Sequence, residues 1–226
     1  FTDVSKIAEG LVLNSYNSIF SGYNEIQNAI SHNLNLNYFS FNLFNYTNVY
    51  ARLSYNKSID QIRNLTTFES VVASSSPFNS AYADENFSAN GRFQRQFGKL
   101  RVSLKGGFNY SKFNQFIQTS TTPSLSESYS QNYGATIRTS FKQAPNVELG
   151  YNYSFSENIL GSINSTSSTK APFIDIDALI LKSFTFRTRY TNNTFSDDRG
   201  GLNKYEFWNA SLAYKKDQDS KWEFEL

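Results

Sequence analysis

About ten stretches of this chain alternate apolar and polar residues with a period of two. In residues 147–155, Val147, Leu149 and Tyr151 alternate with Glu148 and Asn152. A helix would repeat its apolar residues every three or four positions, whereas successive residues of a strand point to opposite faces of a sheet. The alternation therefore predicts strands that have one apolar face and one polar face.

The same alternation recurs along most of the sequence. The other alternating segments are residues 32–44, 48–56, 87–97, 99–110, 133–141, 173–181, 184–190, 206–214 and 221–226. Two of them depart from strict alternation. The apolar register changes between Tyr38 and Phe39, which predicts a β-bulge, and Arg95 falls on the apolar side of its segment. Arg95 lies close to a turn, so its long side chain can reach toward a polar interface.

The composition narrows the class of protein. The 226 residues carry 21 basic and 19 acidic side chains, a net charge of +2 without a basic run, which argues against a nucleic-acid partner. Aromatic residues make up 17%, yet the mean hydropathy is −0.50, a combination that suits strands with one wet face and one lipid face. The absence of cysteine excludes disulfides and thiolate metal sites. No apolar run is long enough for a membrane helix.

The connections between the alternating segments differ in length. Short breaks at residues 45–48, 98–99, 143–146, 182–183 and 216–220 alternate with longer polar stretches at 65–83, 119–128, 161–170 and 192–202. Outer-membrane barrels have short periplasmic turns and long outer loops. We therefore predict an all-β fold, an antiparallel transmembrane β-barrel with about ten strands in residues 31–226. Residues 1–30 are expected to be a loop that leads into the first strand, with a short strand near Leu11–Leu13. The alternative is a soluble β-sandwich, whose loops would be similar at both ends.

A barrel wall predicts the surroundings of three sets of side chains. The charged residues expected to face the lumen are Arg52, Arg92, Arg101, Lys105, Arg138, Glu148, Asp175, Asp177, Arg187, Arg189, Glu223 and Glu225. The apolar residues expected to face lipid include Val147, Leu149, Tyr151, Ile174, Ile176, Phe184 and Leu212. An aromatic girdle beside the short turns would contain Phe97, Phe141, Phe184, Tyr214 and Trp222.

Residues 173–190 also predict a strand register. A three-residue loop of Leu181, Lys182 and Ser183 would place Ile180 opposite Phe184. Counting outward, Asp177 then faces Arg187 and Asp175 faces Arg189, so that residues of the same face pair. A two-residue loop would set Asp177 against Thr188 on the other face.

Two stretches resemble a known family. SGYNEIQNAISHNLNLNYFSF (residues 21–41) is similar to a segment that enters a strand in barrels of the TonB-dependent receptor type, and NASLAYKKDQDSKWEFEL (residues 209–226) is similar to the hairpin near their end. The nearest match is the outer-membrane barrel family common in Bacteroidota, which includes SusC-like receptors. The resemblance covers most of the chain. It implies a barrel of about twenty-two strands, of which this chain would be the C-terminal half, together with a plug domain and a TonB box that these residues lack.

The functional expectation is transport. The resemblance implies an integral protein of the bacterial outer membrane that imports a nutrient, with membrane lipid, a plug, TonB and a surface lipoprotein or other complex subunits as partners. A non-transporting barrel subunit and a soluble secreted β-sandwich binding module are the alternatives. We expect no enzyme activity and no cofactor, because the single histidine, His32, lies at a strand start without a catalytic pattern. Residues Asp197 to Gly201 could hold calcium, but their spacing matches no EF-hand pattern and a solvated turn is the preferred interpretation, so no metal site is predicted.

Overall fold

The chain folds entirely into β-structure. The computed structural model describes residues 10–23, 25–69, 72–116, 123–142, 145–180, 183–215 and 223–225, and these contain 14 strands and no helix. The strands form two sheets, one of ten strands and one of four. The predicted all-β class with antiparallel pairing is therefore confirmed.

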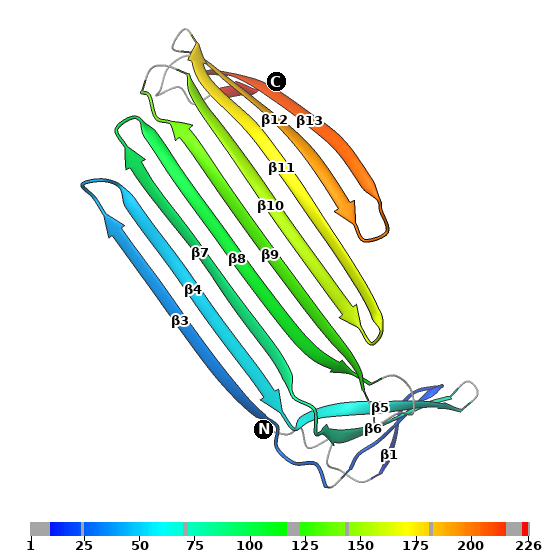
Figure 1. Cartoon of the computed structure of the whole chain (residues 1–226). Helices are drawn as coiled ribbons and strands as arrows, with labels where there is room; N and C mark the ends of the chain where they lie inside the picture. The colour runs from blue at the N-terminus through cyan, green and yellow to red at the C-terminus, as the bar shows by residue number, and fades with distance from the viewer. Residues whose placement is uncertain are drawn as a thin grey trace.

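The ten-stranded sheet is an antiparallel meander in which every strand pairs with its neighbours in order, apart from the step from β4 to β7 (Figure 1). Its strands correspond to the alternating segments of the sequence. They are β3 (Ile30–Asn42), β4 (Thr47–Ile59), β7 (Asp84–Phe97), β8 (Leu100–Gln115), β9 (Ser124–Thr139), β10 (Asn146–Leu160), β11 (Ile163–Ile180), β12 (Phe184–Asp197), β13 (Leu202–Lys215) and β14 (Glu223–Glu225).

The four-stranded sheet lies beyond one end of the large sheet (Figure 1). It consists of β1 (Leu11–Ser15), β2 (Ser18–Ser21), β5 (Gln61–Glu69) and β6 (Val72–Ser80), in the order β1-β2-β6-β5 with β2 parallel to β6. β1 covers the short strand expected near Leu11–Leu13. The expectation of a long loop at residues 65–83 was wrong, because β5 and β6 pair as a hairpin along their whole length.

Side chains join the two sheets at their junction. Arg63 of β5 forms an ion pair with Asp84, the first residue of β7. The other carboxylate oxygen of Asp84 accepts a hydrogen bond from the Asn114 backbone at 3.0 Å, and Asn114 is buried. The ring of Phe78 packs edge-on against Phe116, with 5.0 Å between centroids. A carboxylate shared between both sheets fixes where β7 begins.

The strands run further than the sequence indicated. Residues 163–170 belong to β11 and residues 192–197 to β12, although both were expected in long loops. Their Ser and Thr side chains are compatible with a strand, and every residue of both stretches has a partner on a neighbouring strand. Between β10 and β11 only Gly161 and Ser162 remain as a turn, where Gly161 has a φ of +58° that glycine adopts without strain.

No closed barrel is present in the described part of the chain. β3 and β14 are the two ends of the ten-stranded order, so the sheet is open. The described strands also do not form a sandwich, because all substantial contacts between strands join hydrogen-bonded neighbours within one sheet. The only buried hydrophobic side chains among the described residues are Phe173 and Ala213. Both faces of the sheet are therefore largely open.

The predicted bulge in residues 32–44 is absent. β3 pairs with β4 without interruption from Ile30 opposite Ile59 to Asn42 opposite Thr47. Phe39 and Phe41 consequently lie on the same face as Asn35 and Asn37 rather than with Leu36. β3 is an edge strand with both faces exposed, so no buried core forced its register to shift.

Candidate functional site

One face of the ten-stranded sheet is apolar from β3 to β13. Leu149 of β10 lies opposite Ile137 on β9 and Ile174 on β11, and the exposed fractions of Leu149 and Ile137 are 55% and 53%. All seven residues expected to face lipid are on this face, and none of them is buried. They therefore do not converge on a shared core.

The apolar face is a band of limited height. On β10 it extends from Val147 to Phe155 and on β8 from Leu100 to Tyr110. At about 3.3 Å per residue these runs measure about 26–33 Å along the strand. Strands that are tilted by about 40° would then cover a height of about 20–25 Å, close to the apolar band of outer-membrane barrels.

A row of alternating charges ends the band on four neighbouring strands. Lys57 of β4, Glu85 of β7, Lys112 of β8 and Glu127 of β9 lie directly opposite one another in register. Lys57 Nζ is 3.0 Å from Glu85 Oε1, an ion pair within the row. We call these four residues the boundary row. The row marks where the apolar face ends on these four strands.

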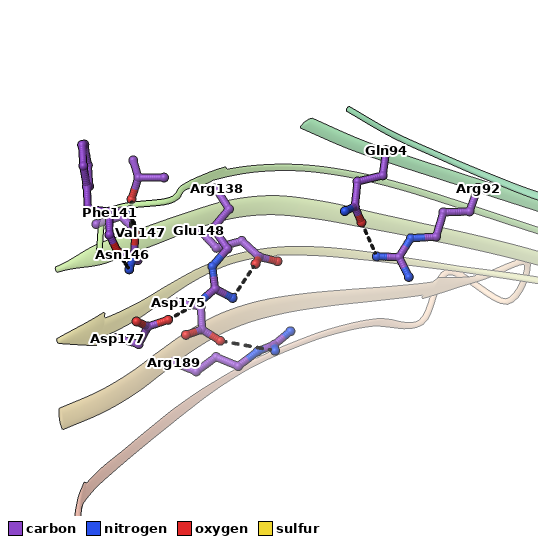
Figure 2. Close-up of polar contacts among 11 residues, drawn as sticks. Arg92, Gln94, Arg138, Phe141, Asn146, Val147, Glu148, Asp175, Asp177 and Arg189 are labelled. Atoms are coloured by element: carbon purple, nitrogen blue, oxygen red, sulfur yellow. Dashed lines mark hydrogen bonds and ion pairs between the residues drawn. The ribbon is translucent and has the colours of Figure 1, made fainter. Parts of the chain in front are cut away.

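The opposite face is polar and carries a cluster of charges near the short turns. The Arg138 guanidinium of β9 lies between two carboxylates, with Nη1 at 3.5 Å from Glu148 Oε2 of β10 and Nη2 in an ion pair with Asp177 of β11. Arg189 Nη1 of β12 is 3.6 Å from Asp175 Oδ2 of β11 (Figure 2). The cluster links four consecutive strands across their hydrogen-bonded ladders.

The aromatic side chain of Phe173 packs against the sheet beside this cluster. Phe173 is 8% exposed and lies over Gly150, where a β-carbon would overlap its ring. The guanidinium carbon of Arg189 stands 4.4 Å from the centroid of the Phe173 ring, a cation–π contact. Gly150 is therefore required by close packing on the polar face, and Phe173 holds Arg189 beside Asp175.

The predicted register of β11 and β12 is confirmed. Ile180 pairs with Phe184, Asp177 with Arg187 and Asp175 with Arg189. The ion pair of Asp177 nevertheless goes to Arg138 rather than to Arg187. Asp177 lies opposite Asn146 on β10, and the long Arg138 side chain reaches it diagonally past Glu148. The strand register correctly predicted which residues lie opposite Asp177. The length of the Arg138 side chain determines which of the nearby arginines forms the ion pair.

The remaining predicted lumen residues lie on the polar face where their side chains are described. Arg52, Arg92, Arg101 and Lys105 occupy β4, β7 and β8 on the side that carries Arg138. Glu223 and Glu225 occupy register positions on β14 opposite Lys215 and Ala213, and their side chains lie outside the described part of the chain.

The aromatic residues expected in a girdle differ in their position on the sheet and in their contacts. Phe184 and Tyr214 face each other on the apolar side with 4.9 Å between ring centroids, and Phe97 is exposed on the same side. Arg95 stands over the Phe97 ring at 4.9 Å on the apolar face, near the turn at Gly98. Phe141 follows the end of β9, where its backbone is clamped by Asn146 at 2.6 Å and 3.1 Å (Figure 2). Trp222 lies outside the described residues.

The acidic residues at the end of β12 accept backbone hydrogen bonds from their own turn and from β11. Asp197 Oδ1 accepts hydrogen bonds from the backbone of Arg199 at 3.1 Å and of Gly201 at 2.7 Å. Asp198 Oδ2 accepts another from the Thr166 backbone at 3.0 Å. Within the described ranges, no three His, Asp or Glu side chains gather in a way that could hold a metal ion. His32 is exposed on β3 opposite Lys57.

Sequence reasoning missed the boundary row and the Phe173–Gly150 contact. The row had a signal, because Lys57, Glu85 and Lys112 continue the apolar parity of their strands by one more step with a charged residue. The contact had no such signal, since it depends on which residues of two strands lie opposite each other.

None of the described residues forms a helix that is long and apolar enough to cross a membrane. Searches against protein-family models, curated proteins and solved structures returned no match to this chain. Functional interpretation therefore depends on the two faces of the sheet.

Proposed function

We propose that the ten-stranded sheet is part of the wall of a bacterial outer-membrane β-barrel. Its apolar face would meet lipid, and its polar face would line a water-filled interior. The observation that carries this proposal is the exposed apolar band, bounded by the charged row at Lys57, Glu85, Lys112 and Glu127. A single sheet in water would expose this band as one continuous apolar patch, far larger than soluble monomers tolerate.

The edges of the sheet support a larger closed structure. Among the described strands, β3, with 13 residues, pairs on one side only and leaves a long row of backbone groups without a strand partner. Unpaired backbone groups in a hydrocarbon environment cost several kcal/mol each, so membrane sheets close into barrels. In this proposal both ends of the ten-stranded order pair with further strands of the same wall.

Within this wall, we infer a role in solute import of the TonB-dependent receptor type. The polar face supplies what such a role needs, namely a lumen surface that carries charged side chains, including Arg138, Glu148 and Asp177. The short turns such as Gly98–Lys99 would face the periplasm and the four-stranded sheet would face outward, as the lengths of barrel connections favour. A plug domain and TonB would be partners. A barrel subunit without transport would share the wall but would not take up solute.

Single-cysteine spin labelling tests the two faces, because this chain has no native cysteine. Labels placed at Leu149, Tyr151 and Tyr153 of β10 should be accessible to oxygen dissolved in lipid when the full-length protein is reconstituted in vesicles. Labels at Glu148, Asn152 and Ser154 should instead be accessible to a water-soluble nickel chelate. Neighbouring positions on one strand serve as matched controls for each other.

The accessibility should therefore alternate with a period of two. Uniform access of the nickel chelate to all six positions would contradict the membrane placement. If the alternation is found, uptake of radiolabelled nutrients by cells with and without the protein separates an importer from a structural barrel subunit.

A further inference from the structure

The polar face of the sheet has two halves that differ in charge balance. On β10 and β11, Glu148, Asp175 and Asp177 provide carboxylates for the cations beside them. On the polar side of β4, β7 and β8, the only carboxylate among the described residues is Asp84, which pairs with Arg63 at the junction with the small sheet. The same side of these strands carries four cations, Arg52, Arg92, Arg101 and Lys105. We call these four residues the cationic patch.

No carboxylate within the described ranges forms an ion pair with any member of the cationic patch. Arg92 Nη2 donates instead to the neutral Gln94 Oε1 at 3.0 Å (Figure 2). Arg52, Arg92 and Lys105 are all exposed, so their charged groups are open to a ligand on that side of the sheet. The patch therefore has charge that the fold itself does not neutralise.

The register brings these like charges together. Arg92 lies directly opposite Lys105, and Arg101 lies directly opposite Arg138. Arg52 occupies the next polar position along β4, opposite Asn90, two residues before Arg92 on β7. Like charges that face each other across antiparallel strands destabilise a sheet. This arrangement does not stabilise the fold. An anion bound between the cations would be attracted to both of them and would offset their repulsion.

A glycine on the neighbouring strand makes room for the Lys105 side chain on the polar face. Position 134, beside Lys105 on β9, is a glycine, and the Lys105 side chain extends across it. Asn90 and Asn132 lie opposite Gly107, the next polar-face position along β8 from Lys105, and carry amide groups that can donate hydrogen bonds. Arginine guanidinium groups bind phosphate and carboxylate oxygens in pairs, which gives both strength and orientation.

We propose that the cationic patch binds a small soluble anion that carries several phosphate or carboxylate charges. Arg92 and Lys105 hold one acidic group between them, and Arg52 contacts a second from the neighbouring strand. Arg101 lies four residues from Lys105, about 13 Å along β8, and attracts the ligand without contacting the same group. The inference rests on the proposed function in one respect, since the polar face must be open to water.

Calorimetric titration of the full-length protein in detergent with inorganic tripolyphosphate tests this site. The dissociation constant should rise by about tenfold or more when Arg92→Gln and Lys105→Gln are combined, because each substitution removes a charge-assisted hydrogen bond to the anion. Arg189→Gln is the matched control, since it removes a cation of the same face that already has Asp175 as a partner. It should change the constant by less than about twofold, and added salt should weaken binding to the native protein.

Lys105→Glu keeps the test informative if the double variant folds poorly. It replaces a repulsive pair by an attractive one opposite Arg92, so the protein should resist denaturant better while tripolyphosphate binding is lost. A merely structural role for Lys105 would give the opposite change in stability.

Three results would overturn the proposal. These are no binding of tripolyphosphate to the native protein, an equal loss in Arg189→Gln, and orthophosphate binding as tightly as tripolyphosphate, which would indicate a site for a single small ion. The spin-label alternation on β10 does not depend on the patch. A wet polar face without anion binding would remove this inference and leave the barrel wall in place.

Discussion

The two faces of the ten-stranded sheet share one backbone and are stabilised in different ways. On the apolar face, side chains such as Leu149 and Ile137 remain more than half exposed, so the surrounding solvent decides what they contribute. On the polar face, side chains contact one another, as Arg189 contacts the Phe173 ring and the Asp175 carboxylate. The adjacent residues Leu149 and Gly150 of β10 therefore contribute to stability in different ways: Leu149 through its contact with the surrounding solvent, and Gly150 through close packing with another side chain.

This difference makes the stability of the sheet depend on its environment. In lipid, the apolar face gains roughly 25 cal/mol for each Å² that is removed from water, whereas in water alone it gains almost nothing because no second layer of described strands covers it. The polar face contributes through pairs worth about 0.2–1 kcal/mol each. We therefore expect an added charge to have a large effect on the apolar face and a small one on the polar face.

Placing an arginine on each face should give the largest contrast. Leu149→Arg puts a charge in the apolar band and should lower the free energy of unfolding by about 1–3 kcal/mol, because the cost of arginine falls from about 2–4 kcal/mol at the membrane midplane to about 0–1 kcal/mol near the interfaces. Ser154→Arg, on the exposed polar face of the same strand, should change it by less than about 1 kcal/mol. Urea unfolding of the protein in lipid vesicles measures both values.

Equal losses from Leu149→Arg and Ser154→Arg would mean that both faces meet the same solvent. That result would contradict the barrel wall directly, since the two residues occupy opposite sides of β10.

Adding a methyl group to a glycine on each face sharpens the same comparison. Gly150→Ala would overlap the ring of Phe173 and approach Thr136 Cγ2 to 3.0 Å, which should destabilise the protein by about 1–3 kcal/mol through overpacking. Gly106→Ala, on the apolar face, would meet only the Tyr133 ring at 3.6 Å, an ordinary contact.

Gly106→Ala should therefore be neutral, or should stabilise by about 0.4–1 kcal/mol through the reduced freedom of the unfolded chain. The difference between the two unfolding midpoints reports how closely each face is packed. A Gly150→Ala variant as stable as Gly106→Ala would show that Phe173 is free to move aside.

The sequence was informative wherever period-two alternation carried the structure. It predicted the strands of the large sheet, the face of Leu149 and Glu148, and the pairing of Asp175 with Arg189. These features follow from local parity and from the length of one turn. It failed at β5 and β6, whose Ser- and Thr-rich residues read as a polar loop because neither strand alternates clearly.

The rest of the candidate site depends on contacts across several strands. That Arg138 rather than Arg187 holds Asp177 follows from the reach of one side chain past β10, which no single hairpin reveals. The cationic patch is similar, because Arg92 and Lys105 become neighbours only once β7 and β8 are in register.

Double-mutant cycles on the polar face give the smallest expected effects and test this last distinction. Asp175→Ala and Arg189→Ala should couple by about 0.2–1 kcal/mol, as an opposed pair at 3.6 Å does. Asp177→Ala should couple in the same range with Arg138→Ala, and more weakly with Arg187→Ala, although Arg187 is its direct partner in the ladder. Measuring unfolding free energies in low and high salt separates charge from packing, because screening weakens only the ion pairs. A larger coupling of Asp177 to Arg187 than to Arg138 would show that register alone selects partners on this face. We expect Arg138, whose guanidinium reaches across β10, to couple to Asp177 more strongly than Arg187 does. The polar face would then be stabilised by contacts that skip a strand as well as by contacts between neighbouring strands.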